Sequence, residues 1–319
     1  MRIISPVDHA REAVSLLQAG ADELYGGYVP HAWQQRFGLL ASINQRTFDG
    51  AQIDSYGGLC TVAQACKDSG GQFALTLNTS FYTDAQLPLL LDYVGEALEA
   101  GVTSVILADL GLLRTLKAEF PRLLFHASTL AHLTNSAAIR FYQAQGIGRV
   151  ILPRHLSLAE MVEIRRQVPD IPCDAFLLVG KCPNTEGLCS FHHSSADKIW
   201  PCEIPYQIEP VAEPVSLPLK QAMKAQASWA TTNRRHGCGL CAIPQLMHAG
   251  FDGLKLVGRG APTQRKLMNI STAVEYSKLA LEIKDFSTYR EAAISSHKRI
   301  FGVSCSENVC YYPELFEHC

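Results

Sequence analysis

The sequence predicts an α/β fold in which eight parallel strands, each followed by a helix, close into a (β/α)8 TIM-like barrel. One pattern recurs along the chain: a helix-like stretch ends in Ala-Gly or a similar small pair, and a short strand-like run follows. The glycine suits a helix C-cap, where the backbone adopts positive φ. The strand-like runs are unbroken in Val, Ile and Leu, which is typical of strands buried on both faces of a parallel sheet.

The predicted elements alternate regularly. Eight strand candidates lie within residues 2–7, 19–27, 69–78, 100–109, 123–127, 145–154, 175–179 and 249–259. Amphipathic helix candidates include residues 9–19, 85–100, 136–145 and 157–167. In the last of these, Ser157 is placed as the N-cap and Glu160 as the acid of a capping box. Eight such units fit a closed barrel best, and the alternative of an open doubly wound sheet lacks its G-x-G-x-x-G signature.

Two stretches interrupt the alternation and are expected to project from the C-terminal face of the barrel. Residues 28–52 form a long loop rich in aromatic and basic side chains, and residues 180–240 form a cysteine-bearing insert between strands seven and eight. Active sites of such barrels are assembled on that face. We therefore predict a barrel over residues 1–285, including the insert, and a cysteine-containing C-terminal tail over residues 286–319.

Composition limits the classes of function. The chain is 47% hydrophobic and 18% charged, which indicates a globular protein, and its formal net charge of −2 provides no global basic field for a nucleic-acid backbone. A small-molecule substrate is favoured for this reason. We find no apolar run long enough for membrane insertion and no signal-peptide pattern at the first residues, so a cytoplasmic location is expected.

The chain has eleven cysteines, and without any sign of export they do not suggest a disulfide framework. Cys60, Cys66 and Cys173 lie singly in apolar segments, where a free cysteine behaves as a small hydrophobic residue. The other eight follow position 180. Candidate metal ligands among them are Cys182, Cys189, Cys202 and Cys241.

Four thiolates without a matching pair of histidines can hold a structural zinc ion or an iron–sulfur cluster. The wide, uneven spacing favours a cluster, because only Cys238 and Cys241 form the tight C-x2-C pair that is typical of zinc. Unliganded cysteines are the third interpretation. The tail adds Cys305, Cys310 and Cys319, which with Cys238 form either a second metal site or a set of unliganded thiols; we favour the latter.

Several segments resemble the collagenase-like U-32 peptidase family. DAFLLVGKCPNTEGLCS at 174–190 is similar to the family signature, in which an acidic residue and Phe precede C-x4-G-x-C. Segments 126–161 and 240–259 also resemble the family, as does a P-C-x3-Y element at Pro201, Cys202 and Tyr206. Together the resemblance covers most of the chain in the right order.

The resemblance implies a 4Fe-4S cluster on Cys182, Cys189, Cys202 and Cys241, the last through its L-C-x-I-x-x-L context. It also implies oxygen-independent hydroxylation, either of ubiquinone precursors or, with prephenate as the oxygen source, of RNA pyrimidines. In length the chain is similar to the short forms of ubiquinone biosynthesis, which are thought to work as pairs, so a homologous partner subunit in a heterodimer is expected.

Two positions differ from the family pattern. Where family members commonly show His-Gly-Ala before the first cysteine, this chain has Leu178, Val179 and Gly180. Where they often show K-I-E-G-R, residues 255–259 read Lys-Leu-Val-Gly-Arg. The absence of that His and Glu disfavours the family's usual substrate.

Side chains at the carboxyl ends of the barrel strands are the candidates for chemistry. The predicted catalytic residues are Asp109, His126, Arg154 and Lys255. The predicted substrate-binding residues are Tyr25, Asn78, Ser128 and Arg259. Arg154 and Arg259 could fork onto a carboxylate or form structural ion pairs, His126 could be an acid–base group or a hydrogen-bonded core residue, and Asp109 could instead cap a helix.

The leading hypothesis is an iron–sulfur enzyme that hydroxylates a small aromatic or quinone-like substrate without oxygen. RNA hydroxylation is an alternative, for which Arg36, Arg46, Arg234 and Arg235 could form a basic rim. A non-catalytic iron–sulfur partner subunit is another. Proteolysis ranks last, because the sequence contains no G-x-S-x-G, no H-E-x-x-H and no Cys–His nucleophile context.

Overall fold

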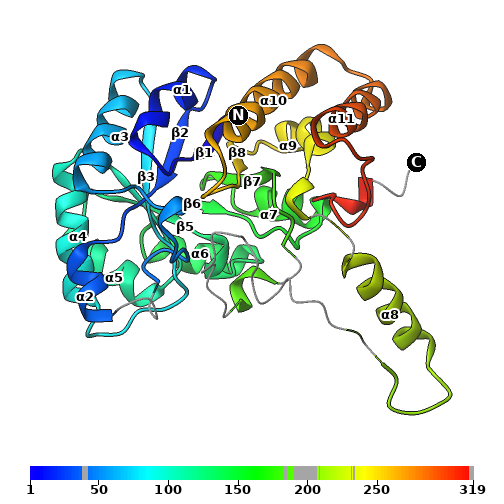
Figure 1. Cartoon of the computed structure of the whole chain (residues 1–319), viewed down its shortest axis with the longest axis horizontal. Coiled ribbons are helices and arrows are strands. Elements are labelled where there is room, and N and C mark those ends of the chain that lie inside the picture. The colour runs from blue at the N-terminus through cyan, green and yellow to red at the C-terminus, as the bar shows by residue number, and fades with distance from the viewer. Residues whose placement is uncertain are drawn as a thin grey trace.

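Eight parallel strands close into one barrel in the order β1 to β8, which confirms the predicted (β/α)8 architecture (Figure 1). The computed structural model describes residues 1–37, 42–182, 185–189, 207, 209–230, 232 and 234–315. The strands are β1 (Arg2–Pro6), β2 (Glu23–Gly26), β3 (Gln72–Leu77), β4 (Ser104–Leu107), β5 (Leu124–Ala127), β6 (Ile147–Ile151), β7 (Cys173–Leu178) and β8 (Gly253–Leu256). Apart from Leu124, which is exposed at the start of β5, their Val, Ile and Leu side chains are buried, as expected of strands covered on both faces.

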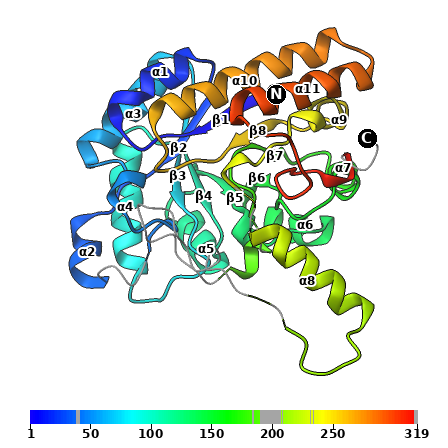
Figure 2. The same cartoon turned by 45° about the vertical axis from the view of Figure 1, so that its right-hand side comes forward.

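The helices surround the strands in the order of the sequence (Figures 1 and 2). They are α1 (Ala13–Gln18), α2 (His31–Phe37), α3 (Tyr56–Asp68), α4 (Leu87–Glu99), α5 (Leu110–Glu119), α6 (Ser136–Ala144), α7 (Leu158–Gln167), α8 (Leu217–Ala230), α9 (Ile243–His248), α10 (Thr263–Glu282) and α11 (Phe286–Phe301). Helix α8, between β7 and β8, projects away from the barrel in both views. No helix in the described part of the chain combines the length and apolar character that crossing a membrane requires.

Local signals set several helix starts. The capping box predicted for α7 is confirmed, since Glu160 N donates to Ser157 Oγ at 3.3 Å and Ser157 N donates to Glu160 Oε2 at 2.8 Å. Residues 28–52, expected as a long loop, contain helix α2. Its Trp33 is buried, and the centre of its ring lies 6.3 Å from that of Tyr82 in an edge-on arrangement. The helix thus packs an aromatic side chain against the loop that follows β3.

A layer of charged side chains crosses the barrel interior below its C-terminal end. Arg149 donates to Glu23 at 2.5 Å and lies 3.8 Å from Asp174, so strands β2, β6 and β7 are joined through their side chains. All three residues are at most 7% exposed. Buried charges of this kind persist only when they are paired, and the layer forms the polar floor beneath the pocket described below.

The C-terminal segment packs onto the open end of β7. Tyr311 and Tyr312 are buried, and their hydroxyls donate to the carbonyl oxygens of Val179 at 2.7 Å and Phe176 at 3.0 Å. Cys238 forms isolated bridges with Leu178 and Cys310. The described part of the tail therefore contacts the barrel beside the candidate site.

Candidate functional site

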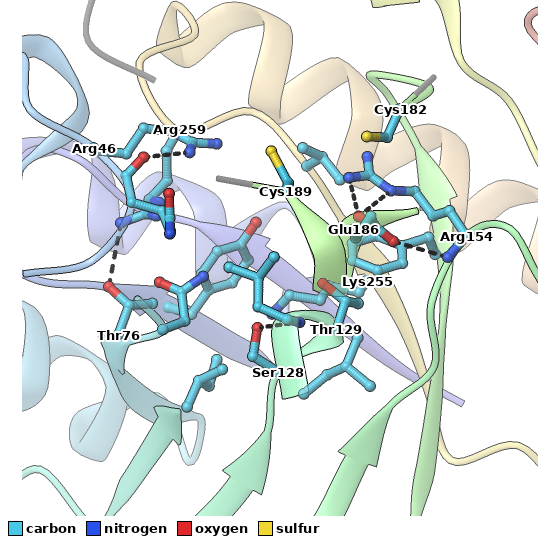
Figure 3. A pocket seen from close by; sticks show the side chains of 18 residues that line it. Arg46, Thr76, Ser128, Thr129, Arg154, Cys182, Glu186, Cys189, Lys255 and Arg259 are labelled. Atoms are coloured by element: carbon cyan, nitrogen blue, oxygen red, sulfur yellow. Dashed lines mark hydrogen bonds and ion pairs between the residues drawn. The ribbon is translucent and has the colours of Figure 1, made fainter. Parts of the chain in front are cut away.

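A cavity of about 120 Å³ opens where the carboxyl ends of the strands meet (Figure 3). Its walls come from the ends of β2 through β8 and from the loops that follow them. Eight of the residues predicted from sequence line it, namely Tyr25, Asn78, Ser128, Arg154, Cys182, Cys189, Lys255 and Arg259. Active sites of (β/α)8 barrels lie at this end because the loops converge there.

The pocket carries an excess of positive charge. Among the residues that the structure describes, four cationic side chains line it, Arg46, Arg154, Lys255 and Arg259, against the single carboxylate of Glu186. Burial, followed by repulsion from Arg259, lowers the pKa of Arg46 to about 9, and burial also lowers the pKa of Arg259. These pKa shifts mean that the cations lack enough negative charge around them, and an anionic ligand would supply it.

Arg46 and Arg259 lie on one side of the pocket (Figure 3). Arg259 Nη1 donates to Thr76 Oγ1 at 3.3 Å and its Nη2 donates to the carbonyl oxygen of Asn44. Arg46 Nη1 donates to the carbonyl oxygen of Gln45 at 2.8 Å, whereas its buried Nε has no hydrogen-bond partner among the described residues. A buried donor without a partner costs free energy, so this nitrogen marks a place for a ligand oxygen.

The backbone that carries Arg46 is held by buried amides. Asn44 and Gln52 exchange two hydrogen bonds of 2.8 and 2.9 Å, and Gln52 Nε2 also donates to the carbonyl oxygen of Arg46 at 2.8 Å. Thr79, after β3, donates to the carbonyl oxygen of Ser42 at 2.6 Å. The loop after β2 is thereby fixed to the loop after β3, and Arg46 is positioned in advance of binding.

Lys255 enters the pocket from the middle of β8. Its Nζ lies 3.5 Å from the centre of the Tyr25 ring and has no hydrogen-bond partner among the described residues. Burial lowers the pKa of Lys255 to about 8, while Glu23 and Asp174 in the layer below partly oppose that effect. The ammonium group is therefore a buried cation that a ring face and distant carboxylates stabilise incompletely.

Arg154 and Glu186 lie on the opposite side and hold the loop that carries the cysteines (Figure 3). Arg154 Nε donates to Glu186 Oε1 at 2.7 Å, its backbone N donates to Oε2 at 2.9 Å, and its Nη1 donates to the carbonyl oxygen of Gly180. Although burial alone would lower it, the Glu186 carboxylate raises the pKa of Arg154. Arg154 thus forms a structural ion pair. Arg259 and Arg46 are the arginines of the pocket that remain candidates for binding a substrate carboxylate.

Two predicted catalytic residues lie outside the pocket lining. Asp109 caps α5, because its Oδ1 accepts a hydrogen bond of 2.6 Å from Leu112 N. His126 lies in the charged layer with its Nδ1 3.9 Å from Glu23, and burial, followed by Arg149, lowers its pKa well below the usual value. Asp109 thus follows the end of β4, and His126 lies within β5. The catalytic roles of both residues remain predictions.

The structure divides the predicted cysteine ligands. Cys182 and Cys189 line the pocket, Cys202 lies outside the described residues, and Cys241 lines a second, smaller cavity. That cavity also contains the side chains of Cys238, Cys305 and Cys310. Among the described residues, no group of three or more Cys, His, Asp or Glu side chains is arranged to hold a metal ion. The four-cysteine ligand set therefore stays a prediction.

Arg46 and Glu186 are the functional residues that sequence reasoning missed at this site. Arg46 was considered only as part of a basic rim, and Glu186 lies inside the cysteine motif between Cys182 and Cys189. In the sequence, Arg46 could have been found as an arginine in the long segment that follows a strand, and Glu186 as an acidic residue between two predicted metal ligands. Neither signal states which partner the side chain meets, since Glu186 and Arg154 are 32 residues apart.

Fold and site together define a (β/α)8-barrel protein with a cationic pocket at its C-terminal face and two cysteines on the lip. The chain belongs to peptidase family U32, whose family model matches residues 9–308. This confirms the resemblance found in the sequence.

Three curated relatives show the range of names in the family. The chain is 29% identical over 187 residues to tRNA hydroxylation protein P of Escherichia coli, covering 59% of this chain and 38% of that protein. It is 23% identical to tRNA hydroxylation protein P1 of Bacillus subtilis, covering 81% of this chain and 58% of that protein. It is 25% identical to a collagenase of Porphyromonas gingivalis, covering 52% of this chain and 36% of that protein. The chain thus spans less than two thirds of the length of each.

Solved structures show the fold alone. The U32 peptidase Mk0906 is 13% identical with a TM-score of 0.48, over 82% of this chain and 94% of that one. Rubisco from Pyrococcus horikoshii is 10% identical with a TM-score of 0.50, over 96% and 66%. The second likeness is consistent with the barrel, and neither carries information on chemistry.

Proposed function

We propose that this protein takes part in oxygen-independent hydroxylation of a small aromatic or quinone-like substrate, and that its pocket binds an acidic group of that substrate or of a co-substrate. One observation carries the proposal: among the described residues, Arg46 Nε and Lys255 Nζ are buried without hydrogen-bond partners in a pocket that Arg259 also lines and to which Glu186 contributes the one carboxylate. The names of the relatives, tRNA hydroxylation proteins, support the reaction class.

The size of the pocket supports a small ligand. A cavity of about 120 Å³ within the barrel mouth admits a single ring with its substituents, and Phe176, Ile106 and Ile151 supply apolar wall. Ligand sites commonly combine such walls with a few placed polar groups. Here Arg259 offers a planar guanidinium, which matches a carboxylate bidentately, and Lys255 offers a point charge.

An iron–sulfur cluster is the cofactor that we propose for the lip of the pocket. Cys182 and Cys189, which line the pocket, would hold it together with Cys202 and Cys241, and thiolates are the ligands such clusters require. The cluster would supply one-electron transfer next to the bound substrate. Arg154 and Glu186 hold the loop with both cysteines against β6, so the chain positions these two thiols relative to the rest of the pocket.

Hydroxylation of tRNA is a second candidate, favoured by the relatives' names. An extruded base would enter the same pocket, and phosphates would need basic side chains around the mouth. The net charge of −2 disfavours broad contact with RNA. The proposal also includes a homologous partner subunit, which is expected from the resemblance to short forms that work as pairs. Such a subunit would supply further basic side chains at the mouth of the pocket.

Anaerobic growth of a strain that lacks the gene provides the test. The strain is complemented with wild type, Arg259→Met or, as a control on the exposed face of α2, Arg36→Met. Quinone intermediates and tRNA nucleosides are then compared by mass spectrometry.

Loss of hydroxylated quinones in the deletion strain, restored by wild type and Arg36→Met but not by Arg259→Met, supports the small-substrate proposal. Loss of hydroxylated pyrimidines with normal quinones assigns the second candidate. Normal levels of both products in the deletion strain would contradict hydroxylation altogether.

A further inference from the structure

Two lysines are buried in the described part of the chain, and their surroundings differ. Lys266 Nζ lies 2.5 Å from both Asp8 and Glu12, so its charge is paired twice. Lys255 Nζ is buried as well, but among the described residues it has no hydrogen-bond partner. An unpartnered buried cation is costly to the fold, which indicates that Lys255 serves the pocket it lines rather than stability.

The amine of Lys255 lies in an apolar part of the pocket (Figure 3). Its Nζ is 3.5 Å from the centre of the Tyr25 ring, and the Tyr25 hydroxyl donates to the carbonyl oxygen of Leu256 at 2.7 Å. The ring is thereby tied to β8, the strand that carries Lys255. Phe176 and Ile106 add apolar wall. A ring face offers no acceptor atom, so the nitrogen is desolvated without being bound.

Desolvation of this kind makes a lysine amine nucleophilic, because it disfavours the protonated form. Burial lowers the pKa of Lys255 to about 8; Glu23 and Asp174 oppose this shift, and Arg149 and Arg259 reinforce it. Glu23 is itself paired with Arg149 at 2.5 Å. At pH 8 about half of the Lys255 side chains would therefore carry the uncharged amine, the form that attacks a carbonyl group.

The neighbouring cations give Lys255 a role other than charge alone. Arg46 and Arg259 line the same pocket, and two guanidinium groups suffice for one carboxylate. Arginine does not lose its proton in proteins, whereas lysine does when it is buried. Of the three, Lys255 is thus the side chain suited to covalent chemistry.

We propose that Lys255 forms an imine with the carbonyl group of an oxo acid whose carboxylate binds Arg259 and Arg46. Lys255 Nζ, as the neutral amine, attacks the carbonyl carbon and gives a carbinolamine. The former carbonyl oxygen then leaves as water with both amine hydrogens, and a C=N bond joins the lysine to the ligand. The step needs no oxidant or reductant, and hydrolysis reverses it. It rests on the acid-binding pocket of the proposed function and names the class of acid.

Reductive trapping on the purified full-length protein provides the test. The protein is incubated at pH 8 with cyanoborohydride and either phenylpyruvate or, as a smaller oxo acid, pyruvate. Reduction of the imine leaves a stable adduct that adds the mass of the acid less one oxygen atom, and peptide mapping locates it. Phenylacetone, which lacks the carboxylate, and phenylacetate, which lacks the carbonyl group, are the matched control compounds.

We expect one adduct, on Lys255, with the oxo acids and no adduct with phenylacetate. Lys255→Met should abolish it, while Lys278→Met, which alters an exposed lysine on α10, should label as wild type does. Arg259→Met should need about tenfold more phenylpyruvate for half-labelling, since it removes a charge-assisted hydrogen bond. Phenylacetone should label Lys255 as weakly in wild type as phenylpyruvate does in Arg259→Met.

The mapping on wild type decides the matter even where Lys255→Met does not fold. The proposal is wrong if neither oxo acid labels Lys255, if exposed lysines are labelled as fast as Lys255, or if phenylacetone labels Lys255 as readily as phenylpyruvate. Trapping requires no turnover, so its outcome is separate from the product analysis above. Missing adducts with normal hydroxylated products would overturn the imine alone, and adducts without any hydroxylated product would overturn the proposed function alone.

Discussion

Arg154 and Glu186 hold the cysteine loop against the end of β6 through hydrogen bonds from both the side chain and the backbone of Arg154. The Glu186 side chain is 5% exposed and the Arg154 side chain 15%. Because Glu186 lies between Cys182 and Cys189, this one ion pair positions both predicted ligands relative to the cationic wall across the pocket.

Removing the acid of this pair should destabilise the protein. Glu186→Ala leaves the Arg154 guanidinium buried without its carboxylate, and breaking a buried pair from one side costs about 3 kcal/mol. The free energy of unfolding in urea measures the effect. Glu163→Ala, which removes an exposed ion pair with Arg166 on α7, serves as control and should change it little. Equal effects of both substitutions would show that the Arg154 pair is not structural.

Loss of Arg46 should weaken binding of small carboxylates. Arg46→Met removes one charge-assisted hydrogen bond, for which about 1.5–3 kcal/mol is typical, so Kd should rise roughly 10- to 150-fold. Calorimetric titration with aromatic mono- and dicarboxylates measures this. Arg36→Met, in the same loop region but exposed, should bind as wild type does. If the two variants bind alike, Arg46 does not face the ligand.

Carboxylate binding should depend on the charge of Lys255. Its pKa lies at about 8, lowered by burial, so the free pocket loses this positive charge as the pH rises through that value. Affinity should therefore be highest below pH 8 and decline above it. Lys255→Met should bind more weakly at pH 7 and lose the decline. A decline that persists in Lys255→Met would assign the titration to another group.

Lys266 of α10 should be essential for stability although it does not line the pocket. Its Nζ lies 2.5 Å from both Asp8 and Glu12 in a fully buried triad. Lys266→Met leaves two carboxylates uncompensated and should cost about 3–5 kcal/mol. Lys278→Met, exposed on the same helix, is the control, and denaturant unfolding of both variants is the measurement. A loss below 1 kcal/mol for Lys266→Met would contradict this role.

Within this triad, Glu12 gives stability a dependence on pH that is opposite in sign to that of Asp8, whose pKa is raised by burial. The pKa of Glu12 is lowered from 4.5, because Lys266 and hydrogen bonds outweigh the opposing effect of burial. A carboxyl whose folded pKa is lowered contributes stability above its unfolded pKa and loses that contribution as the pH falls. Wild type should therefore lose stability below pH 4.5 more steeply than Glu12→Gln.

The sequence predicted those parts of the fold that depend on local patterns. Ser157 and Glu160 are three residues apart, and their capping box requires no knowledge of the rest of the chain. The barrel prediction followed from eight strand candidates, five of them in one recurring local pattern, that alternate with helix candidates. Trp33 shows where local patterns no longer suffice for prediction. Its segment was expected to be a loop but contains a helix, α2, whose Trp33 packs against Tyr82, a residue far away in the sequence.

The site was predictable only in part, because its electrostatics arise from distant pairs. Tyr25, Lys255 and Arg259, chosen for their places at strand ends, line the pocket, and their roles there stay predictions. The pairing of Arg154 with Glu186 and the location of Cys241 beside Cys305 depend on how loops fold over the barrel end. Spacing along the chain contains no information on either.

The iron content of anaerobically purified protein tests the central claim, that the cysteines at the pocket hold an iron–sulfur cluster. Iron, acid-labile sulfide and the electron paramagnetic resonance spectrum are compared between wild type and Cys189→Ser, with Cys60→Ser as control. The account predicts about four irons per chain in wild type and in Cys60→Ser, and their loss in Cys189→Ser. Wild type without iron, or iron retained in Cys189→Ser, would contradict it.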